Sequence, residues 1–204
     1  DVYIISNVLS KETKENFFMI SKEFNRKIFF VEIDNIYEEF TKNNDFPKSA
    51  YARLFTENIS DKIDKILYLD CDTVIVNDIS GLWNTDIDEY YFAGVQDPIQ
   101  RFNVELVGLS KEYRYINSGV LLINLKKWRE DNLKNKFVEC MERFNGKVPH
   151  HDQGVLNIVC KDKIKYLSPK YNLMPELICM NSKQLKRIYK MKNFYTDEEI
   201  LEAN

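Results

Sequence analysis

The sequence has few of the residues that build disulfide-bonded or zinc-binding domains. Its 204 residues include four cysteines and two histidines, and no C-x-x-C pair or zinc-type spacing occurs among them. We therefore expect free thiols, the usual state in the reducing cytoplasm, at all four positions. These cysteines are Cys71, Cys140, Cys160 and Cys179.

The sequence also lacks a long apolar run. No segment approaches the ~20 consecutive apolar residues that a membrane-spanning helix needs. The mean hydropathy of −0.43 agrees with this. We expect a cytoplasmic protein, and a peripheral association with the inner face of the membrane would require a segment that this chain does not contain.

An excess of basic residues is absent as well. The chain carries 29 Lys and Arg against 32 Asp and Glu, for a formal net charge of −3. This balance argues against a nucleic-acid partner, which would select a basic surface. Aromatic residues make up 13% of the chain, a content typical of well-packed cores and of clefts that stack sugars and bases.

Strand-like and helix-like segments alternate along the chain without repeats or linkers. This alternation favours an α/β fold with a mostly parallel central sheet flanked by helices, organised as a single domain over residues 1–204. Apolar runs predict strands at 2–6, 28–33, 65–69, 91–95, 119–124 and 164–167. Helical spacing and capping residues predict helices at 10–25, 49–58, 126–144 and 151–160, and a capping box at Thr196 opens a last one.

Two carboxylates, Asp70 and Asp72, directly follow the apolar strand at 65–69 and are separated by one residue. At the carboxyl end of a strand, this spacing lets both side chains turn toward one divalent cation. Mg²⁺ and Mn²⁺ prefer such oxygen ligands, and they bridge them to phosphate oxygens. Because an Asp-x-Asp is short, it fits equally well two aspartates that cap a strand end or bind backbone amides.

The segment from Asp70 to Ile75 also resembles the first motif of haloacid dehalogenase-type phosphatases, D-x-D-x-[TV]-[LVI]. In that motif the first aspartate is a nucleophile and the second is an acid/base. These phosphatases also need a late acidic pair at the end of a further strand, and no such pair follows residue 76. Their motif stands near the N-terminus, whereas two strand-helix units precede it here. We therefore favour a metal site at Asp70 and Asp72 over the phosphatase interpretation.

A second polar segment, Asn117-Ser118-Gly119, stands directly before the apolar run that ends at Asn124. Asn117 offers both a donor and an acceptor to sugar hydroxyls, and Gly119 permits close backbone approach. Taken alone, the segment predicts a tight turn before a core strand.

Further polar candidates are His150, His151, Asp152 and Gln153, and Arg53. Adjacent histidines on a helix do not face one another, so a two-histidine metal chelate is disfavoured. Asp152 stands at a helix start, where it either caps the helix or, with Gln153, holds sugar hydroxyls near an anomeric carbon. Arg53 suits a phosphate partner, and a surface salt bridge is its alternative role.

The order of these motifs resembles glycosyltransferase family 8, which includes bacterial lipopolysaccharide galactosyl- and glucosyltransferases and glycogenin. The matching segments are Ser-x-Tyr-x-Arg-Leu, Leu-Tyr-Leu-Asp-x-Asp-x-x-Val, Asn-Ser-Gly-Val-Leu-Leu-Ile-Asn-Leu-x-x-Trp and Asp-Gln-Gly-x-Leu-Asn. They extend from Ile4 to about Asn172. The resemblance therefore covers most of the chain.

The resemblance implies a GT-A fold and a retaining transferase that moves glucose or galactose from a UDP-sugar to a glycan or lipopolysaccharide-type acceptor with Mn²⁺ or Mg²⁺. Asp70 and Asp72 match the family's metal-binding pair, which also reaches the donor. The residues of this sequence that match the family's donor-binding positions are Arg53, Asn117, Ser118 and Asp152. Gln153 matches the side chain near the reacting carbon, so Asp152 and Gln153 are the expected catalytic residues.

Two parts of the family pattern do not occur in this chain. The family begins with a strand and helix that bind uracil and ribose, and it ends with a His-x-x-Gly-x-x-Lys-Pro-Trp segment that supplies a metal ligand and a phosphate-binding lysine. Neither His150 nor His151 matches that segment. We therefore expect the chain to be incomplete at both ends. A degenerate sugar-nucleotide-binding domain without catalysis is the main alternative to an active transferase.

Overall fold

The computed structural model describes residues 1–6, 8–32, 51–98, 104–189 and 193–203. These residues form two compact units, 1–60 and 61–204. The organisation as a single domain therefore stays a prediction. No helix among the described residues has the length and apolar character needed to cross a membrane.

The first unit begins with a strand, a helix and a second strand: β1 (Val2–Ser6), α1 (Lys11–Glu23) and β2 (Ile28–Glu32). The strands pair in parallel, from Val2 opposite Ile28 onward. Ser10 caps α1 as predicted, because its hydroxyl accepts a hydrogen bond from the Thr13 amide at 3.0 Å. A 3₁₀ helix, η1 (Ala52–Ile59), belongs to the same unit. The start of the helix predicted at 49–58 lies outside the described residues.

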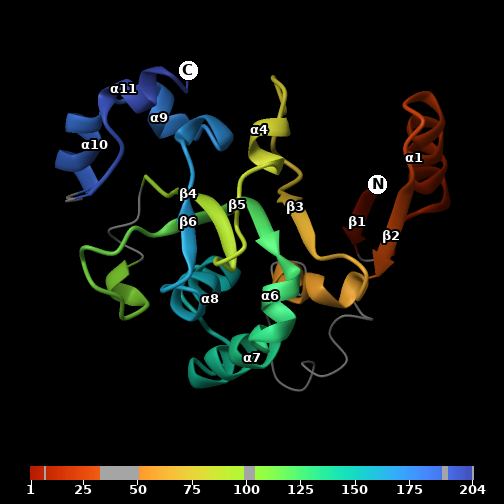
Figure 1. The fold of residues 1–204 in the computed structure, drawn as a ribbon, viewed down its shortest axis with the longest axis horizontal. Helices are drawn as coiled ribbons and strands as arrows, with labels where there is room; N and C mark the ends of the chain where they lie inside the picture. Colours follow the sequence, from red (N-terminus) through yellow and green to blue (C-terminus); the bar gives the residue numbers. More distant parts are fainter. Residues whose placement is uncertain (7, 33–50, 99–103, 190–192, 204) are drawn as a thin grey trace. The chain divides into compact units, whose positions relative to one another are not determined.

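A four-stranded sheet forms the centre of the second unit (Figure 1). Its order is β3 (Lys65–Leu69), β5 (Ile116–Asn124), β4 (Phe92–Gln96) and β6 (Ile164–Tyr166). β4 and β6 are parallel, whereas β5 runs antiparallel to both of its neighbours. The carboxyl ends of β3 and β4 therefore point toward the same edge of the sheet, with β5 between them.

Helices cover one face of this sheet through a shared apolar cluster. Ala93 and Val95 of β4 and Val120 and Leu122 of β5 belong to the cluster, and residues two apart on a strand share a face. The cluster also takes one leucine or isoleucine from each of α4 (Ser80–Trp83), α9 (Pro175–Cys179), α10 (Ser182–Tyr189) and α11 (Asp197–Leu201). A 3₁₀ turn, η2 (Pro169–Tyr171), connects β6 to α9. The predicted capping box at Thr196 opens α11.

The helix predicted over 126–144 is wrong as a continuous element. The structure has two helices there, α6 (Leu125–Glu130) and α7 (Leu133–Arg143), separated at Asn132. Asn132 adopts a left-handed conformation with φ of 52°, which asparagine tolerates better than most residues. Just before it, the Asp131 carboxylate accepts hydrogen bonds from Tyr91 and Lys163, which fix the break.

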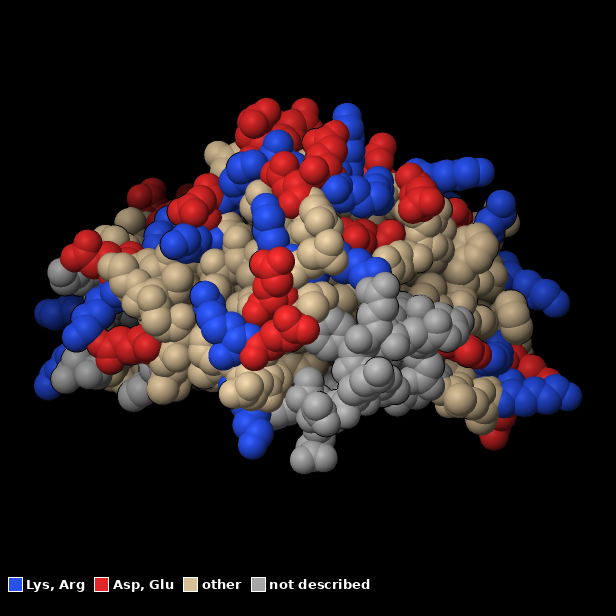
Figure 2. All heavy atoms as spheres, turned by 90° about the horizontal axis from the view of Figure 1, so that it is seen from below, with Lys and Arg blue, Asp and Glu red and all other residues tan. Residues whose placement is uncertain are grey.

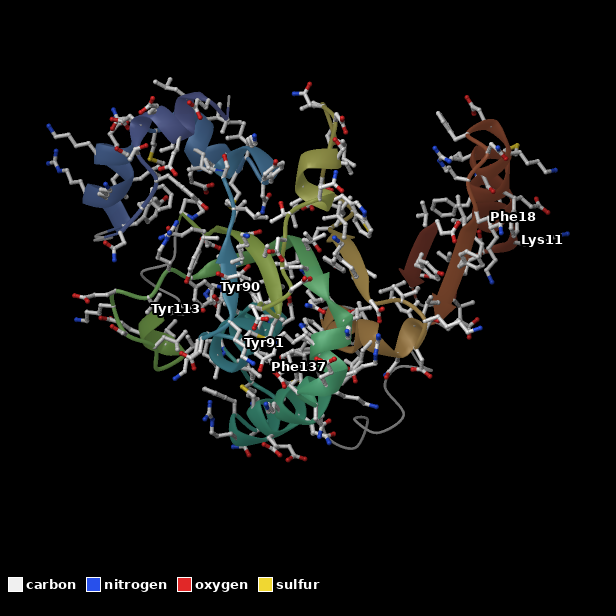
Figure 3. The ribbon with its side chains drawn as sticks, in the orientation of Figure 1. Lys11, Phe18, Tyr90, Tyr91, Tyr113 and Phe137 are labelled. Carbon is white, nitrogen blue, oxygen red and sulfur yellow. The ribbon has the colours of Figure 1, made fainter. Side chains whose placement is uncertain are left out.

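The Asp131 contacts also have an electrostatic consequence. The hydrogen bond from Lys163 is the main reason why the pKa of Asp131 lies below its ordinary value, and the bond from Tyr91 acts in the same direction. Figure 3 labels Tyr91 and Phe137, which come from the residue before β4 and from α7. Over the face shown in Figure 2, Lys and Arg are interspersed with Asp and Glu.

Trp128 of α6 joins the helices to the sheet. Its indole N–H donates to the Tyr91 carbonyl at 2.8 Å, and its ring packs edge-on against Phe137 at 5.1 Å between centroids. The side chain is 0% exposed, so both contacts are made in the interior. One residue therefore fixes α6 and α7 against the start of β4.

We predict that Trp128→Ala lowers the free energy of unfolding by about 3–5 kcal/mol, because it removes a fully buried aromatic side chain and leaves a cavity. Trp83→Ala is the matched control, since Trp83 is 43% exposed. Its loss should cost under about 1 kcal/mol. Urea denaturation followed by far-UV circular dichroism compares the two variants, and equal losses would contradict this account of the core.

Candidate functional site

Asp70 lies at the carboxyl end of β3, next to the middle of β5. Its amide donates to the Gly119 carbonyl at 2.8 Å, which continues the β3–β5 ladder by one residue. Its carboxylate accepts a hydrogen bond from the Tyr68 hydroxyl at 2.8 Å. Tyr68 and Asp70 are two residues apart, so the strand presents both side chains on one face. The end of β3 thus orients this carboxylate before any ligand arrives.

A tight turn carries the chain from Asp70 to Thr73. The Asp70 carbonyl accepts from the Thr73 amide at 3.2 Å and from the Thr73 hydroxyl at 2.7 Å. The main-chain carbonyl of Asp70 accepts the hydrogen bonds that close the turn, and its carboxylate does not take part in them. Asp72 lies inside the turn with an exposed side chain. Both aspartates therefore belong to one short turn at the strand end.

Gly119 provides room for the Asp70 carboxylate. A Cβ atom at this position would lie 3.1 Å from Asp70 Oδ2 and 3.1 Å from Asn117 Oδ1, closer than most real Cβ contacts. The Gly119 amide donates to the same Asn117 oxygen at 2.9 Å. The predicted close approach at this glycine is thus a contact with two site oxygens.

The turn predicted at Asn117-Ser118-Gly119 is wrong, because these residues lie inside β5. Two of their amides bond to side chains: Gly119 to Asn117, and Ser118 to Gln153 of the helix α8 (His151–Val159). The pairing with β4 also shifts register between Gly94 and Gln96. These side-chain partners let a sequence typical of turns continue as a strand.

The first turn of α8 carries Asp152 and Gln153. Asp152 does not cap the helix, because the cap position is His150, whose backbone is left-handed with φ of 57°. Instead Asp152 is 7% exposed and accepts from the Ser118 hydroxyl at 3.0 Å. A Cβ at Gly154 would lie 2.1 Å from the Pro149 carbonyl oxygen, so only glycine lets α8 begin in this position.

Asp97 is a site residue that sequence reasoning missed. It directly follows β4 and is 4% exposed. Its Oδ2 atom accepts from Gln153 Nε2 at 2.9 Å and from Asn117 Nδ2 at 3.4 Å. In the sequence, the Asp97-Pro98 pair predicts the end of a strand. The signal that could have identified Asp97 as a site residue is its place directly after a buried strand, which Asp70 shares after β3.

Further hydrogen bonds fix the relative position of β5 and α8. The side-chain oxygen of Asn157 accepts from the Ile116 amide at 2.7 Å, and its Nδ2 donates to the Ile116 carbonyl at 2.9 Å. Asn117 Oδ1 also accepts from Asn172 at 2.9 Å.

Burial is the main reason why the pKa of Tyr115 is raised, and the charges of Asp97 and Asp152 add to it.

The structure thus brings most of the predicted site residues to one edge of the sheet. Asp70, Asn117, Ser118, Asp152 and Gln153 gather there around β5, and Asp97 joins them. Arg53 is buried in η1 of the first unit, so its place in the site stays a prediction. No group of three or more His, Cys, Asp or Glu side chains within the described ranges is arranged to hold a metal ion.

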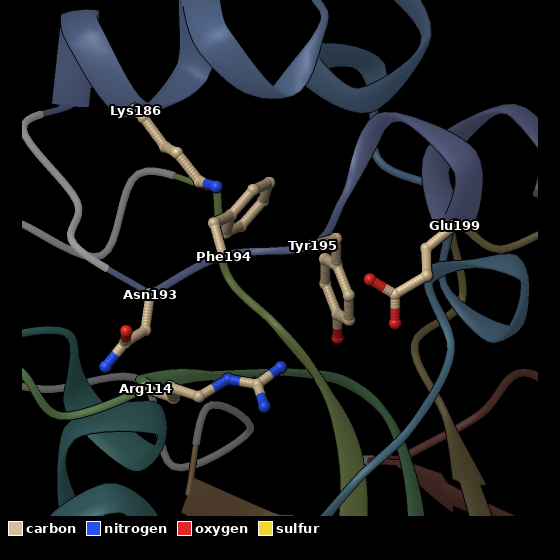
Figure 4. A pocket seen from close by; sticks show the side chains of 6 residues that line it. All are labelled: Arg114, Lys186, Asn193, Phe194, Tyr195 and Glu199. Atoms are coloured by element: carbon tan, nitrogen blue, oxygen red, sulfur yellow. The ribbon is translucent and has the colours of Figure 1, made fainter.

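A pocket of about 370 Å³ is lined by other residues (Figure 4). These are Arg114, Lys186, Asn193, Phe194, Tyr195 and Glu199. Arg114 donates through Nε to Gln96 at 2.8 Å and lies over the Tyr166 ring at 4.2 Å. Because Gln96 and Asp97 are consecutive, the bond from Arg114 to Gln96 also supports the backbone next to Asp97.

Several curated proteins are similar to this chain. A putative glycosyltransferase of Haemophilus influenzae is 33% identical over 179 residues, which cover 85% of this chain and 54% of that protein. General stress protein A of Bacillus subtilis is 28% identical, with 84% and 62% covered. A lipopolysaccharide 1,2-glucosyltransferase of Escherichia coli is 29% identical, with 83% and 52% covered. The chain spans little more than half the length of these relatives.

Two solved structures share the fold. The galactosyltransferase LgtC, determined with donor and acceptor sugar analogs, gives a TM-score of 0.74 at 22% identity, with 94% of this chain and 73% of that chain covered. GlyE of Streptococcus pneumoniae gives 0.67 at 24% identity, with 93% and 42% covered. The α/β architecture is therefore the predicted GT-A fold. The sequence profile described as "Glycosyl transferase family 8" matches residues 1–194, and the chain belongs to that family.

Proposed function

We propose that the protein transfers a hexose, glucose or galactose, from a UDP-sugar to a carbohydrate acceptor with retention of anomeric configuration. The observation that carries this proposal is the gathering of Asp70, Asp152 and Gln153 around β5 in a chain of family 8. Relatives named as lipopolysaccharide glucosyl- and galactosyltransferases support a glycan or glycolipid acceptor. The four free cysteines support a cytoplasmic location.

The donor set at the end of β3 fits a divalent cation. Asp70 and Asp72 supply only oxygen ligands, which Mn²⁺ and Mg²⁺ prefer, and Gly119 leaves room beside the Asp70 carboxylate. In this proposal these two aspartates hold the ion. A bound ion would supply positive charge to the diphosphate as it leaves.

The remaining residues bind and orient the donor. Asp152 is a buried carboxylate on the first turn of α8, suited to accept hydrogen bonds from donor-sugar hydroxyls. Asn117 and Ser118 present amide and hydroxyl groups from β5 to the same sugar. Arg53 would pair with the diphosphate, since a guanidinium matches phosphate geometry. Together they hold the sugar while its anomeric carbon becomes oxocarbenium-like.

The surroundings of Gln153 support a route without a glycosyl-enzyme. Its Oε1 atom already accepts a hydrogen bond from the Ser118 amide at 2.9 Å. An amide oxygen is a weak nucleophile, and this donor weakens it further. We therefore favour attack by the acceptor from the face that the diphosphate leaves. Family membership removes the phosphatase interpretation of Asp70, and a degenerate binding domain is the outcome that the first test below would reveal.

We predict that Asp70→Asn and Asp72→Asn each lower metal-dependent turnover by about 100-fold or more, because each removes charge that holds the ion. The measurement is release of UDP from UDP-glucose and UDP-galactose by the full-length protein, with and without Mn²⁺. Asp162→Asn serves as the control, since Asp162 is exposed on the link between α8 and β6. No UDP release by the wild-type full-length protein would contradict catalysis and favour the degenerate domain, whereas wild-type turnover in both site variants would contradict the metal-holding role of Asp70 and Asp72.

We further predict that Gly119→Ala raises the KM for the UDP-sugar about 10-fold while leaving thermal stability nearly unchanged. The added methyl group would meet Asp70 Oδ2 and Asn117 Oδ1, and both oxygens would have to move by a few tenths of an ångström. Steady-state kinetics and a thermal melt separate the two effects. A variant with wild-type KM would show that the carboxylate does not need this space.

A further inference from the structure

Asp97 holds one end of the Gln153 amide, and β5 holds the other. Ser118 N donates to Gln153 Oε1 at 2.9 Å, and Gln153 Nε2 donates to Asp97 Oδ2 at 2.9 Å. A backbone N–H can only donate, so it must face the oxygen of the amide. The amide nitrogen therefore points away from Ser118, toward Asp97. The two contacts together select one of the two orientations that differ by a flip of the amide.

Asp97 is itself fixed by the strand that carries it. Its amide donates to the Tyr115 carbonyl at 2.8 Å, which ties the end of β4 to the chain that enters β5. The preceding residue, Gln96, is 0% exposed and binds Arg114 through Oε1 and the Asn193 carbonyl through Nε2, each at 2.8 Å. Arg114 and Asn193 both line the pocket in Figure 4. The main-chain bond to Tyr115 and the side-chain bonds of Gln96 therefore fix the backbone that carries Asp97.

We propose that Asp97 is a positioning residue whose buried carboxylate fixes the orientation of the Gln153 amide beside the reacting carbon. This inference rests on the proposed role of Gln153 in sugar transfer. Asp97 acts through Gln153 and does not touch the donor. When the carboxylate is removed, Nε2 loses its acceptor in a partly buried setting, and only the bond from the Ser118 amide still restrains the side chain. The ordered geometry on which the transfer depends is then lost.

A direct test observes the Gln153 side-chain amide in the full-length protein by ¹H–¹⁵N NMR, with Gln153→Ala to assign its signals. In the wild type we expect one amide proton to be shifted downfield by the bond to a carboxylate. Asp97→Ala should abolish this downfield shift. Asp97→Asn should keep the amide ordered, because its side-chain oxygen accepts the same bond. Unchanged Gln153 signals in Asp97→Ala would overturn the proposal.

A double-mutant cycle then tests whether Asp97 acts only through Gln153. We expect Asp97→Ala to lower kcat for UDP release by about 10- to 100-fold, with the KM for UDP-glucose within about 2-fold of wild type. In the Gln153→Ala background, Asp97→Ala should cause no further loss. An equal loss in both backgrounds would mean that Asp97 acts directly on the substrate and would overturn a positioning role.

Two further outcomes keep the result decisive. If Asp97→Ala does not fold, Asp97→Asn decides alone: a positioning role predicts nearly wild-type kcat and ordered Gln153 signals, and a large loss of kcat overturns it. If Gln153→Ala leaves kcat unchanged, the proposed role of Gln153 in transfer fails. The NMR comparison still decides whether Asp97 orients that amide, so the two failures are distinguishable.

Discussion

β5 runs antiparallel between β3 and β4, and the site depends on this arrangement. Because β5 pairs with both neighbours, the two flanking strands share a direction and end at the same edge of the sheet. Asp70 and Asp97 follow those ends directly. The amide of Asp70 bonds to Gly119 at the centre of this edge, so one strand sets the spacing between two carboxylates from distant parts of the sequence.

The same strand supplies hydrogen-bond donors that stabilise the buried carboxylates. A buried carboxylate is costly unless hydrogen bonds replace its water shell. Asp97 accepts bonds from Gln153 and Asn117, and Asp152 accepts one from Ser118. Such connected polar groups are rigid when each member is bonded, which suits a site that must bind a sugar in one orientation. The helix α8 contributes only its first turn, and Gly154 and Asn157 determine where that turn lies.

The sequence predicted the parts of the site that depend on local pattern. An apolar strand followed by Asp70 can be recognised from a few neighbouring residues, and so can the Ser10 cap and the Thr196 capping box. The direction of β5 is not visible, because an apolar run reads the same in either orientation. Asp97 was missed for a related reason, since its importance lies in a partner 56 residues away. The break at Asn132 depends on tertiary contacts of Asp131 while the apolar spacing continues across it.

In the proposed mechanism, the turn after β3 holds a divalent ion against the diphosphate of a sugar nucleotide. A crystal structure of the full-length protein with UDP and Mn²⁺, read by manganese anomalous scattering, tests it most directly. We expect an anomalous peak in direct coordination with carboxylate oxygens of Asp70 and Asp72 and with the UDP diphosphate. A nucleotide bound elsewhere, or manganese without contact to these two aspartates, would contradict it.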